Sequence, residues 1–462
     1  MSHFLYISLA LLSYYYAPHL YDLTFCWWLA LLYMLIMWSA IKNDIAQKNA
    51  LSFNVLFSFM LFIVTFVTPL FAQTAYDDLP ILFGDHNSTI NKATALVVLA
   101  YSIYNYGWHK SVDKYKYVLN HSEIIVPYQV VNVMNTLTII MTLIFVTSII
   151  FFLRDSASDK NDIESGIIVL LTEAVLISSI AVNVVYNKPQ SIIEYFTKDK
   201  LVVSCAVICI LLSLYIGDRT LPLFLIVTLL GVYTLCVRKI SLVSLMPLLL
   251  IAAMFFFFIG QTRKGENSLR QGGVDAFASG VESIVTENSS SLFMFADLLP
   301  ASEILYLAYE YPKMHQSYFN PWRIIPYATS PIPYVPNVLS EVMFGVPIKE
   351  MSSAYVLTEE YSRSVTYVEG GLGTHIVGDI YVSWGVIGVI IFFYLFGLFI
   401  GYIQSNTHRL LPMVVYVAML AYAVYLPRDV MYGNYRLIVY LLVVIWFCQW
   451  VTNLKITTKT HR

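Results

Sequence analysis

The stretch EGGLGTHIVGDIYVSWGVIGVIIFFYLFGLFIG, residues 369–401, joins a polar segment to an apolar run long enough to cross a membrane. From Gln261 to about His375 no apolar run reaches that length, whereas the residues before Gln261 form one apolar run after another. A helix needs about 20 apolar residues to cross the hydrocarbon core of a bilayer. We therefore expect a membrane-embedded chain that is interrupted by one large loop, with its chemistry in that loop.

The composition supports this expectation for the whole chain. It is 58% hydrophobic and only 12% charged, whereas soluble domains are roughly a quarter charged. We predict an all-α integral membrane protein with about 12 transmembrane helices, within a range of 10 to 14. The predicted spans are 3–18, 22–41, 51–72, 92–108, 131–153, 166–186, 201–216, 221–237, 241–260, 376–402, 410–426 and 436–452.

This pattern divides the chain into three parts. Residues 1–260 form the first nine spans, 261–375 the large external loop, and 376–462 the last three spans with the C-terminus. The loop is expected to contain short amphipathic helices on the membrane mouth, and its proline-rich stretch 321–336 is expected to follow an extended or turning path.

The basic residues predict the orientation of the chain. With the N-terminus in the cytoplasm, 14 lysines and arginines fall in inner segments, six in short outer loops and seven in the long loop. The positive-inside rule then places both termini in the cytoplasm and the long loop outside. The net charge of −2 gives no support to nucleic-acid binding.

Arginines are the predominant cations on the predicted outer side. A guanidinium is a planar fork that binds phosphate or carboxylate in a bidentate manner, which indicates an anionic ligand. The alternative is that these arginines only snorkel to the surface or are offset by Asp218 and Asp429. The arginines considered are Arg219, Arg263, Arg270, Arg323, Arg363, Arg428 and Arg436.

The glycine-rich beginning of the tenth span holds a second candidate. His375 and Asp379 are four residues apart and share a helix face, and either could act as a general base. The glycines from Gly378 to Gly401 could instead be helix-packing sites. Glu173, within the sixth span, is a third candidate, because a carboxylate in a span is costly unless it has a function or a partner.

Motifs for metals and cofactors are missing from the sequence. No nucleotide-binding loop, dinucleotide fingerprint or zinc signature occurs, and the five cysteines all lie in apolar runs. We expect no cofactor and no metal, with arginine in the place of a metal ion.

Taken together, these features resemble the oligosaccharide repeat-unit polymerases (Wzy-type, O-antigen polymerase family). The similarity covers about 200–440 and includes the turn Gly217-Asp-Arg219-Thr, the motif Gln261-Thr-Arg263-Lys-Gly265 and the aromatic and proline-rich stretch from Arg323. It also includes the glycine-rich run from Gly373 to Gly388, which is followed by a Phe-rich body.

The resemblance implies a GT-C-like polytopic glycosyltransferase of the bacterial inner membrane. Its donor and acceptor would be glycans linked to undecaprenyl diphosphate, and membrane lipid, a flippase and a chain-length regulator would be its partners. It implies catalytic roles for His375, Asp379 and Arg263. The implied binding residues are Arg219, Arg270, Arg323, Arg428 and Arg436 for the diphosphate, and Trp322, Tyr327 and Tyr381 for the sugars.

Two other functions remain open at this point. An O-antigen ligase is also a polytopic transferase with an arginine- and histidine-bearing outer loop, but it would use lipid A as the acceptor. A lipid-linked oligosaccharide flippase or other transporter would favour an inverted repeat and charged groups at mid-membrane. The sequence shows no convincing repeat, and Glu173 is its one strong mid-span charge.

Overall fold

The computed structural model describes most of the chain. The described residues are 2–46, 49–75, 87–115, 122–154, 163–216, 218, 220–241, 244, 300–364, 373–431, 433–454 and 456–460. Arg219, Arg263, Arg270 and nearly all of the predicted span 241–260 lie outside them.

Every other predicted span coincides with a helix. These helices are α1 (Ser2–Tyr15), α2 (Leu23–Ala46), α3 (Phe53–Ala75), α5 (Ile90–Tyr115), α6 (Tyr128–Arg154), α7 (Ile163–Asn187), α9 (Lys200–Tyr215), α10 (Thr220–Cys236), α17 (Ile376–Ser405), α18 (Leu410–Tyr422) and α19 (Gly433–Thr452).

Among the described residues, six of these helices are long and apolar enough to cross a membrane, namely α2, α3, α6, α7, α17 and α19. Helices α9, α10 and α18 are apolar but shorter. The prediction of an all-α membrane protein is thus confirmed, whereas the count of twelve spans stays a prediction. Helix α18 ends at Tyr422, earlier than expected, and the turn after it is irregular. Irregular backbone is tolerated near membrane depth where protein surrounds it or where it lines a cavity.

The described part of the large loop folds as short helices, as predicted. They are α13 (Pro300–Met314), η3 (Pro321–Arg323), α14 (Ile324–Ala328), α15 (Val335–Phe344), η4 (Ile348–Met351) and α16 (Ser353–Ser364). The proline-rich stretch differs from expectation, because it begins with helical turns. Pro321 occupies the first position of η3, where a missing N–H costs nothing, and the Asn320 side chain accepts the Trp322 N–H.

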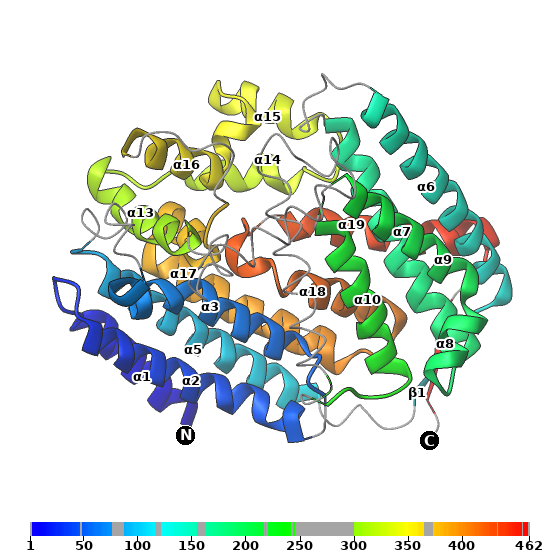
Figure 1. Cartoon of the computed structure of the whole chain (residues 1–462), viewed down its shortest axis with the longest axis horizontal. Coiled ribbons are helices and arrows are strands. Elements are labelled where there is room, and N and C mark those ends of the chain that lie inside the picture. The colour runs from blue at the N-terminus through cyan, green and yellow to red at the C-terminus, as the bar shows by residue number, and fades with distance from the viewer. Residues whose placement is uncertain are drawn as a thin grey trace, which may run out of the picture.

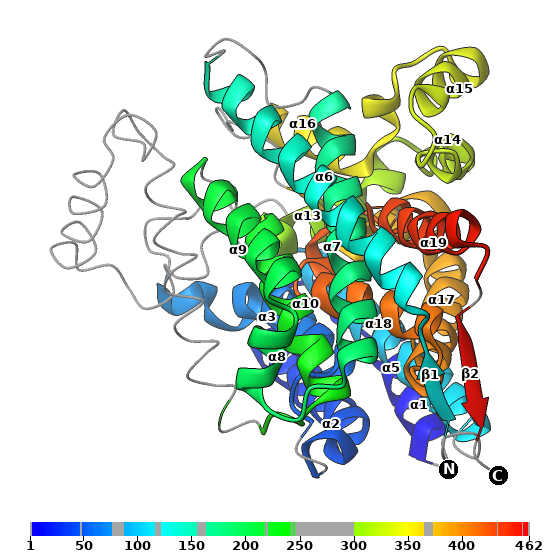
Figure 2. The ribbon, with the colours of Figure 1, turned by 90° about the vertical axis from the view of Figure 1, so that its right-hand side faces the viewer.

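Two small elements were not predicted, the helix α8 (Ile192–Lys198) and a two-stranded ribbon. Strand β1 (Ser122–Ile125) pairs antiparallel with β2 (Thr457–Thr460), so the C-terminal tail joins the connection before α6. Figures 1 and 2 show both chain ends at one end of the molecule and α13–α16 toward the opposite end. We call these ends the terminal face and the loop face.

Helices α5 and α17 form the most extensive helix contact in the described part of the chain. Glycines make their close approach possible. A Cβ at Gly397 would lie 2.2 Å from the Tyr104 carbonyl oxygen, and a Cβ at Gly107 would lie 2.5 Å from that of Tyr394. These glycines are therefore packing sites, as small residues often are between membrane helices.

Replacing Gly397 by alanine is expected to destabilise the protein by about 1–3 kcal/mol, because overpacking forces the two helices apart. Thermal unfolding of the purified protein in detergent measures this loss. Gly166→Ala is the matched control, since a Cβ there meets no atom within 4 Å. Equal unfolding temperatures for the two variants would contradict the packing role of Gly397.

Helix α17 is interrupted at Gly385, where φ is +63° and the Tyr318 hydroxyl would lie 2.8 Å from an added Cβ. Before this break the helix is buried by protein, whereas its exposed apolar stripe begins after it, at Ile387, Ile391 and Leu395. The residues from 386 to 405 measure about 30 Å as a helix, which matches the hydrocarbon core. The first turns of α17 therefore belong to the loop face rather than to the membrane.

Candidate functional site

The loop is fastened to the first turns of α17 by a buried ion pair between Arg323 and Asp379. Both side chains are 0% exposed. The Arg323 Nη2 atom donates to the Asp379 Oδ1 atom and to the Asp379 carbonyl oxygen, at 2.6 Å each. The Arg323 guanidinium also lies over the rings of Phe319 and Trp384, with its carbon 5.1 and 5.9 Å from their centroids. A planar guanidinium that hydrogen-bonds at its edge while its face lies over aromatic rings is an arrangement that arginine supplies and lysine does not.

The Asp379 carboxylate has two further donors, from two other segments. The Ser353 hydroxyl, at the start of α16, donates to Oδ1, and the Met431 N–H donates to Oδ2 at 2.9 Å. Asp379 thus joins the loop, α17 and the turn before α19. We call Arg323, Asp379, Ser353 and Met431 the clasp. A carboxylate with both oxygens occupied and no exposure is suited to positioning these segments.

His375 caps the N-terminus of α17. Its Nδ1 atom accepts the Val377 N–H at 3.2 Å, and its Nε2 atom lies 3.2 Å from the Thr65 hydroxyl. Because Nδ1 is an acceptor, the ring is neutral and Nε2 carries the proton. Burial lowers the pKa of His375 to about 3, which agrees with this neutral state. The ring is fully buried, so it meets no ligand in this conformation.

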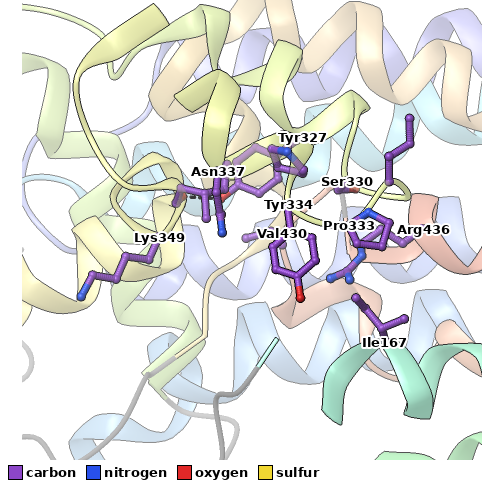
Figure 3. Close-up of a pocket in the computed structure, with 12 residues that line it drawn as sticks. Ile167, Tyr327, Ser330, Pro333, Tyr334, Asn337, Lys349, Val430 and Arg436 are labelled. Carbon is purple, nitrogen blue, oxygen red and sulfur yellow. Dashed lines mark hydrogen bonds between the residues drawn. The ribbon is translucent and has the colours of Figure 1, made fainter. Parts of the chain in front are cut away.

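A cavity of about 320 Å³ lies where the loop meets the first residues of α7 and α19. This volume is at the lower end of the range for small-molecule sites. The lining residues are Ile167, Tyr327, Ser330, Ile332, Pro333, Tyr334, Pro336, Asn337, Ile348, Lys349, Val430 and Arg436 (Figure 3). We call this cavity the loop pocket.

Two cations line the loop pocket. Figure 3 shows the Arg436 guanidinium beside Pro333 and Tyr334 and close to Ile167, whereas Lys349 extends away on the other side of the pocket. Arg436 is partly buried, and among the described residues its buried Nε atom has no hydrogen-bond partner. A partly buried guanidinium with an open donor is suited to binding an anion.

Carboxyl groups lie beside the Arg436 end of the pocket. The hydroxyl of Tyr422, at the end of α18, interacts electrostatically with Glu173, Asp429 and Arg436. Asp429 precedes the pocket residue Val430 and accepts its N–H at 2.7 Å. Burial, with a smaller contribution from nearby Asp379, raises the pKa of Asp429 to about 6 against the opposing effects of the Val430 hydrogen bond and Arg428. A carboxyl with a pKa near neutrality can exchange a proton with a bound hydroxyl.

The predicted site residues that the structure describes lie in five environments. Tyr327 and Arg436 meet in the loop pocket, and Arg323 and Asp379 form the clasp. The Arg428 carbonyl accepts the Thr374 N–H next to His375. Tyr381 is buried in a stack with Tyr309, with ring centroids 4.7 Å apart, and Trp322 is exposed at the surface.

Lys349 and Asp429 were not among the site residues predicted from the sequence. Lys349 is one of seven cations in the loop, and nothing in its spacing indicates that it lines the same pocket as Arg436. Asp429 could have been found, because it follows Arg428 directly in a turn between two apolar runs. The sequence suggested only that Asp429 offsets the charge of Arg428. In the structure, Arg428 does lower the pKa of Asp429, but burial has the larger effect and raises it.

The comparisons with known proteins identify the family. A family model described as O-antigen polysaccharide polymerase Wzy matches residues 1–461, which is practically the whole chain. Comparisons with curated proteins and with solved structures gave no match. The apolar helices and the arginine-bearing pocket at the loop face agree with a multi-pass membrane protein of polysaccharide biosynthesis. The chain therefore belongs to the Wzy family of O-antigen polysaccharide polymerases.

Proposed function

We propose that this protein joins oligosaccharide repeat units linked to undecaprenyl diphosphate into a surface polysaccharide, an O-antigen or a capsule. Transfer would take place on the outer face of the bacterial inner membrane, with both termini in the cytoplasm and the loop face outside. The observation that carries the proposal is the loop pocket, where Arg436 and Tyr327 meet.

The pocket suits the chemistry of glycosyl transfer from a diphosphate. A hydroxyl of the acceptor glycan attacks the anomeric carbon of the donor, the bond from that carbon to the diphosphate oxygen breaks, and undecaprenyl diphosphate leaves. The leaving group gains negative charge, which the Arg436 guanidinium would stabilise, with Lys349 at the opposite wall. This charge stabilisation requires no metal ion.

The remaining roles follow from position. Tyr327 lines the pocket and offers a ring to a sugar face. Asp429, the residue before the lining residue Val430, would accept the proton of the acceptor hydroxyl. The clasp would hold the loop over the pocket, and we assign Arg323 and Asp379 to positioning. Arg219, Arg263 and Arg270, which lie outside the described residues, remain candidates for binding the diphosphate or its departing charge.

The reaction itself can be tested with the purified protein in liposomes that contain only the lipid-linked repeat unit. A ladder of longer lipid-linked glycans, with release of undecaprenyl diphosphate, is expected. Growth of glycan only after lipid A is added would favour a ligase. Movement of the repeat unit across the bilayer without any new glycosidic bond would favour a flippase.

The pH dependence of this reaction tests Asp429. The carboxylate must be deprotonated to accept a proton, so activity is expected to rise with pH and to be half-maximal near pH 6. Asp429→Asn should be slower and should lack this dependence. Asp113→Asn, at an exposed position near the end of α5, is the control. An unchanged acidic limb in Asp429→Asn would refute the assignment.

A further inference from the structure

The loop carries a group of large apolar side chains that no described part of the chain covers. They are Trp322, Ile324, Ile332, Tyr334, Val338 and Val342, and we call them the apolar loop face. Trp322 is 65% exposed and Val342 78%. Val338 and Val342 are four residues apart on α15, so they share one side of that helix. Contiguous exposed apolar surface of this kind marks an interaction site.

The inner side of the same segment is held in place by polar contacts and burial. Arg323 is buried in the clasp next to exposed Trp322, and Pro326 is buried behind Ile324. In α15 the buried Ser340 donates to the Val346 carbonyl oxygen at 2.7 Å. The segment is therefore fixed from inside, while Trp322, Val338 and Val342 remain exposed.

The height of the segment relative to the membrane follows from α19. The Tyr440 hydroxyl donates to the Pro331 carbonyl oxygen at 3.0 Å. The spanning part of α19 begins at Tyr435 and has 18 residues, or about 27 Å, so all of it is needed to cross the hydrocarbon core. Tyr440 lies five residues after Tyr435, or about 7–8 Å along the helix axis toward the membrane interior. Its contact with Pro331 therefore brings the turn before α15 down to the membrane boundary.

The apolar loop face also continues the lipid-facing surface of the spans. Helix α19 exposes Leu442, Val443 and Trp446. In Figure 2, α14 and α15 lie directly above α19, and the loop pocket joins Ile332 and Tyr334 to Arg436 at the beginning of that helix. An apolar surface that borders a bilayer is suited to lipid, and the exposed Glu341, beside Val342, is the one charged residue of α15.

We propose that the apolar loop face inserts into the outer leaflet, so that α14 and α15 lie in the membrane interface. The occupant of this surface is bilayer lipid. The insertion would place the loop pocket at the level where the diphosphate of a lipid-linked molecule sits. This proposal does not depend on the proposed reaction, because it concerns only what covers the side chains of the apolar loop face.

Site-directed spin labelling in liposomes tests this directly. Single cysteines at Val342, at Trp446 on α19 and at Glu359 on α16 are labelled in a chain whose less buried Cys205 and Cys236 are replaced by alanine. Relaxation by oxygen, which enters lipid, is compared with relaxation by a water-soluble nickel chelate. Trp446 is the lipid-facing control and the exposed Glu359 the water-facing control.

The label at Val342 is expected to respond as the one at Trp446 does, with oxygen relaxing it more strongly than the nickel chelate. A response like that of Glu359 would place this surface in water and overturn the proposal. Protection from both reagents would show that a second copy or another protein covers it, and would also overturn it. If the protein in liposomes made no polymer while the label at Val342 still responded like the label at Trp446, only the proposed function would be contradicted.

Discussion

Replacing Arg436 by alanine is expected to lower glycan chain extension by about 100- to 1,000-fold, the range for removing one preorganised donor from a developing oxyanion. Arg436 lines the loop pocket, and in the proposed function its guanidinium would stabilise the leaving diphosphate. Single lipid-linked repeat units should accumulate in cells that carry the variant. Gel separation of lipid-linked glycans measures the effect.

Arg436→Lys and Arg409→Ala are the matched variants. Lysine keeps the charge without the planar fork, so Arg436→Lys should retain part of the activity. Arg409 is exposed in the connection between α17 and α18, at the other end of these helices, so its loss should leave polymer length unchanged. Normal polymer with Arg436→Ala, in a protein that is inserted at wild-type level, would refute the role of Arg436.

Replacing Asp379 by alanine is expected to cost about 3–5 kcal/mol of folding free energy, because it leaves the Arg323 guanidinium buried without its charge partner. Ser353 and Met431 would lose their acceptor as well. Thermal unfolding in detergent measures the loss, and faster proteolysis around 315–335 would report release of the loop. Lys198→Ala, which breaks the exposed pair with Glu194, should leave both readouts unchanged.

A paired replacement separates positioning from catalysis. In Arg323→Met/Asp379→Leu both charges are gone, and apolar replacement of a whole buried ion pair is often neutral for stability. If Asp379 only positions the loop, polymer synthesis should recover together with the fold. A double variant that is stable and inactive would show that the carboxylate takes part in the reaction.

The sequence predicted the helices well because long apolar runs have few alternatives to a membrane helix. It also nominated the beginning of α17 as a site, from His375, Asp379 and the glycines, and this stays a prediction. It could not predict that Arg323 would be buried against Asp379 rather than face a ligand, because the two are 56 residues apart and meet only after the loop folds back. The family match agrees with the resemblance that these motifs carry.

The sequence could not predict the loop pocket, for a related reason. Its walls come from α7, from the loop and from the turn before α19, which are separated by about 80 residues or more at each step. The sequence could suggest Arg436 as an anion-binding residue from its charge, and Tyr327 as a sugar-binding residue from its aromatic ring. Only the packing of α14, α15 and α19 brings them together with Lys349.

The most direct test of the loop pocket as the donor site is photo-crosslinking with a lipid-linked repeat unit that carries a photoreactive group next to the diphosphate. After digestion, mass spectrometry should find the label in residues 327–349 and 430–436. Labelling should fall when unlabelled undecaprenyl diphosphate competes and when Arg436 is replaced by alanine. Label concentrated at the terminal face, or unaffected by the competitor, would contradict the account.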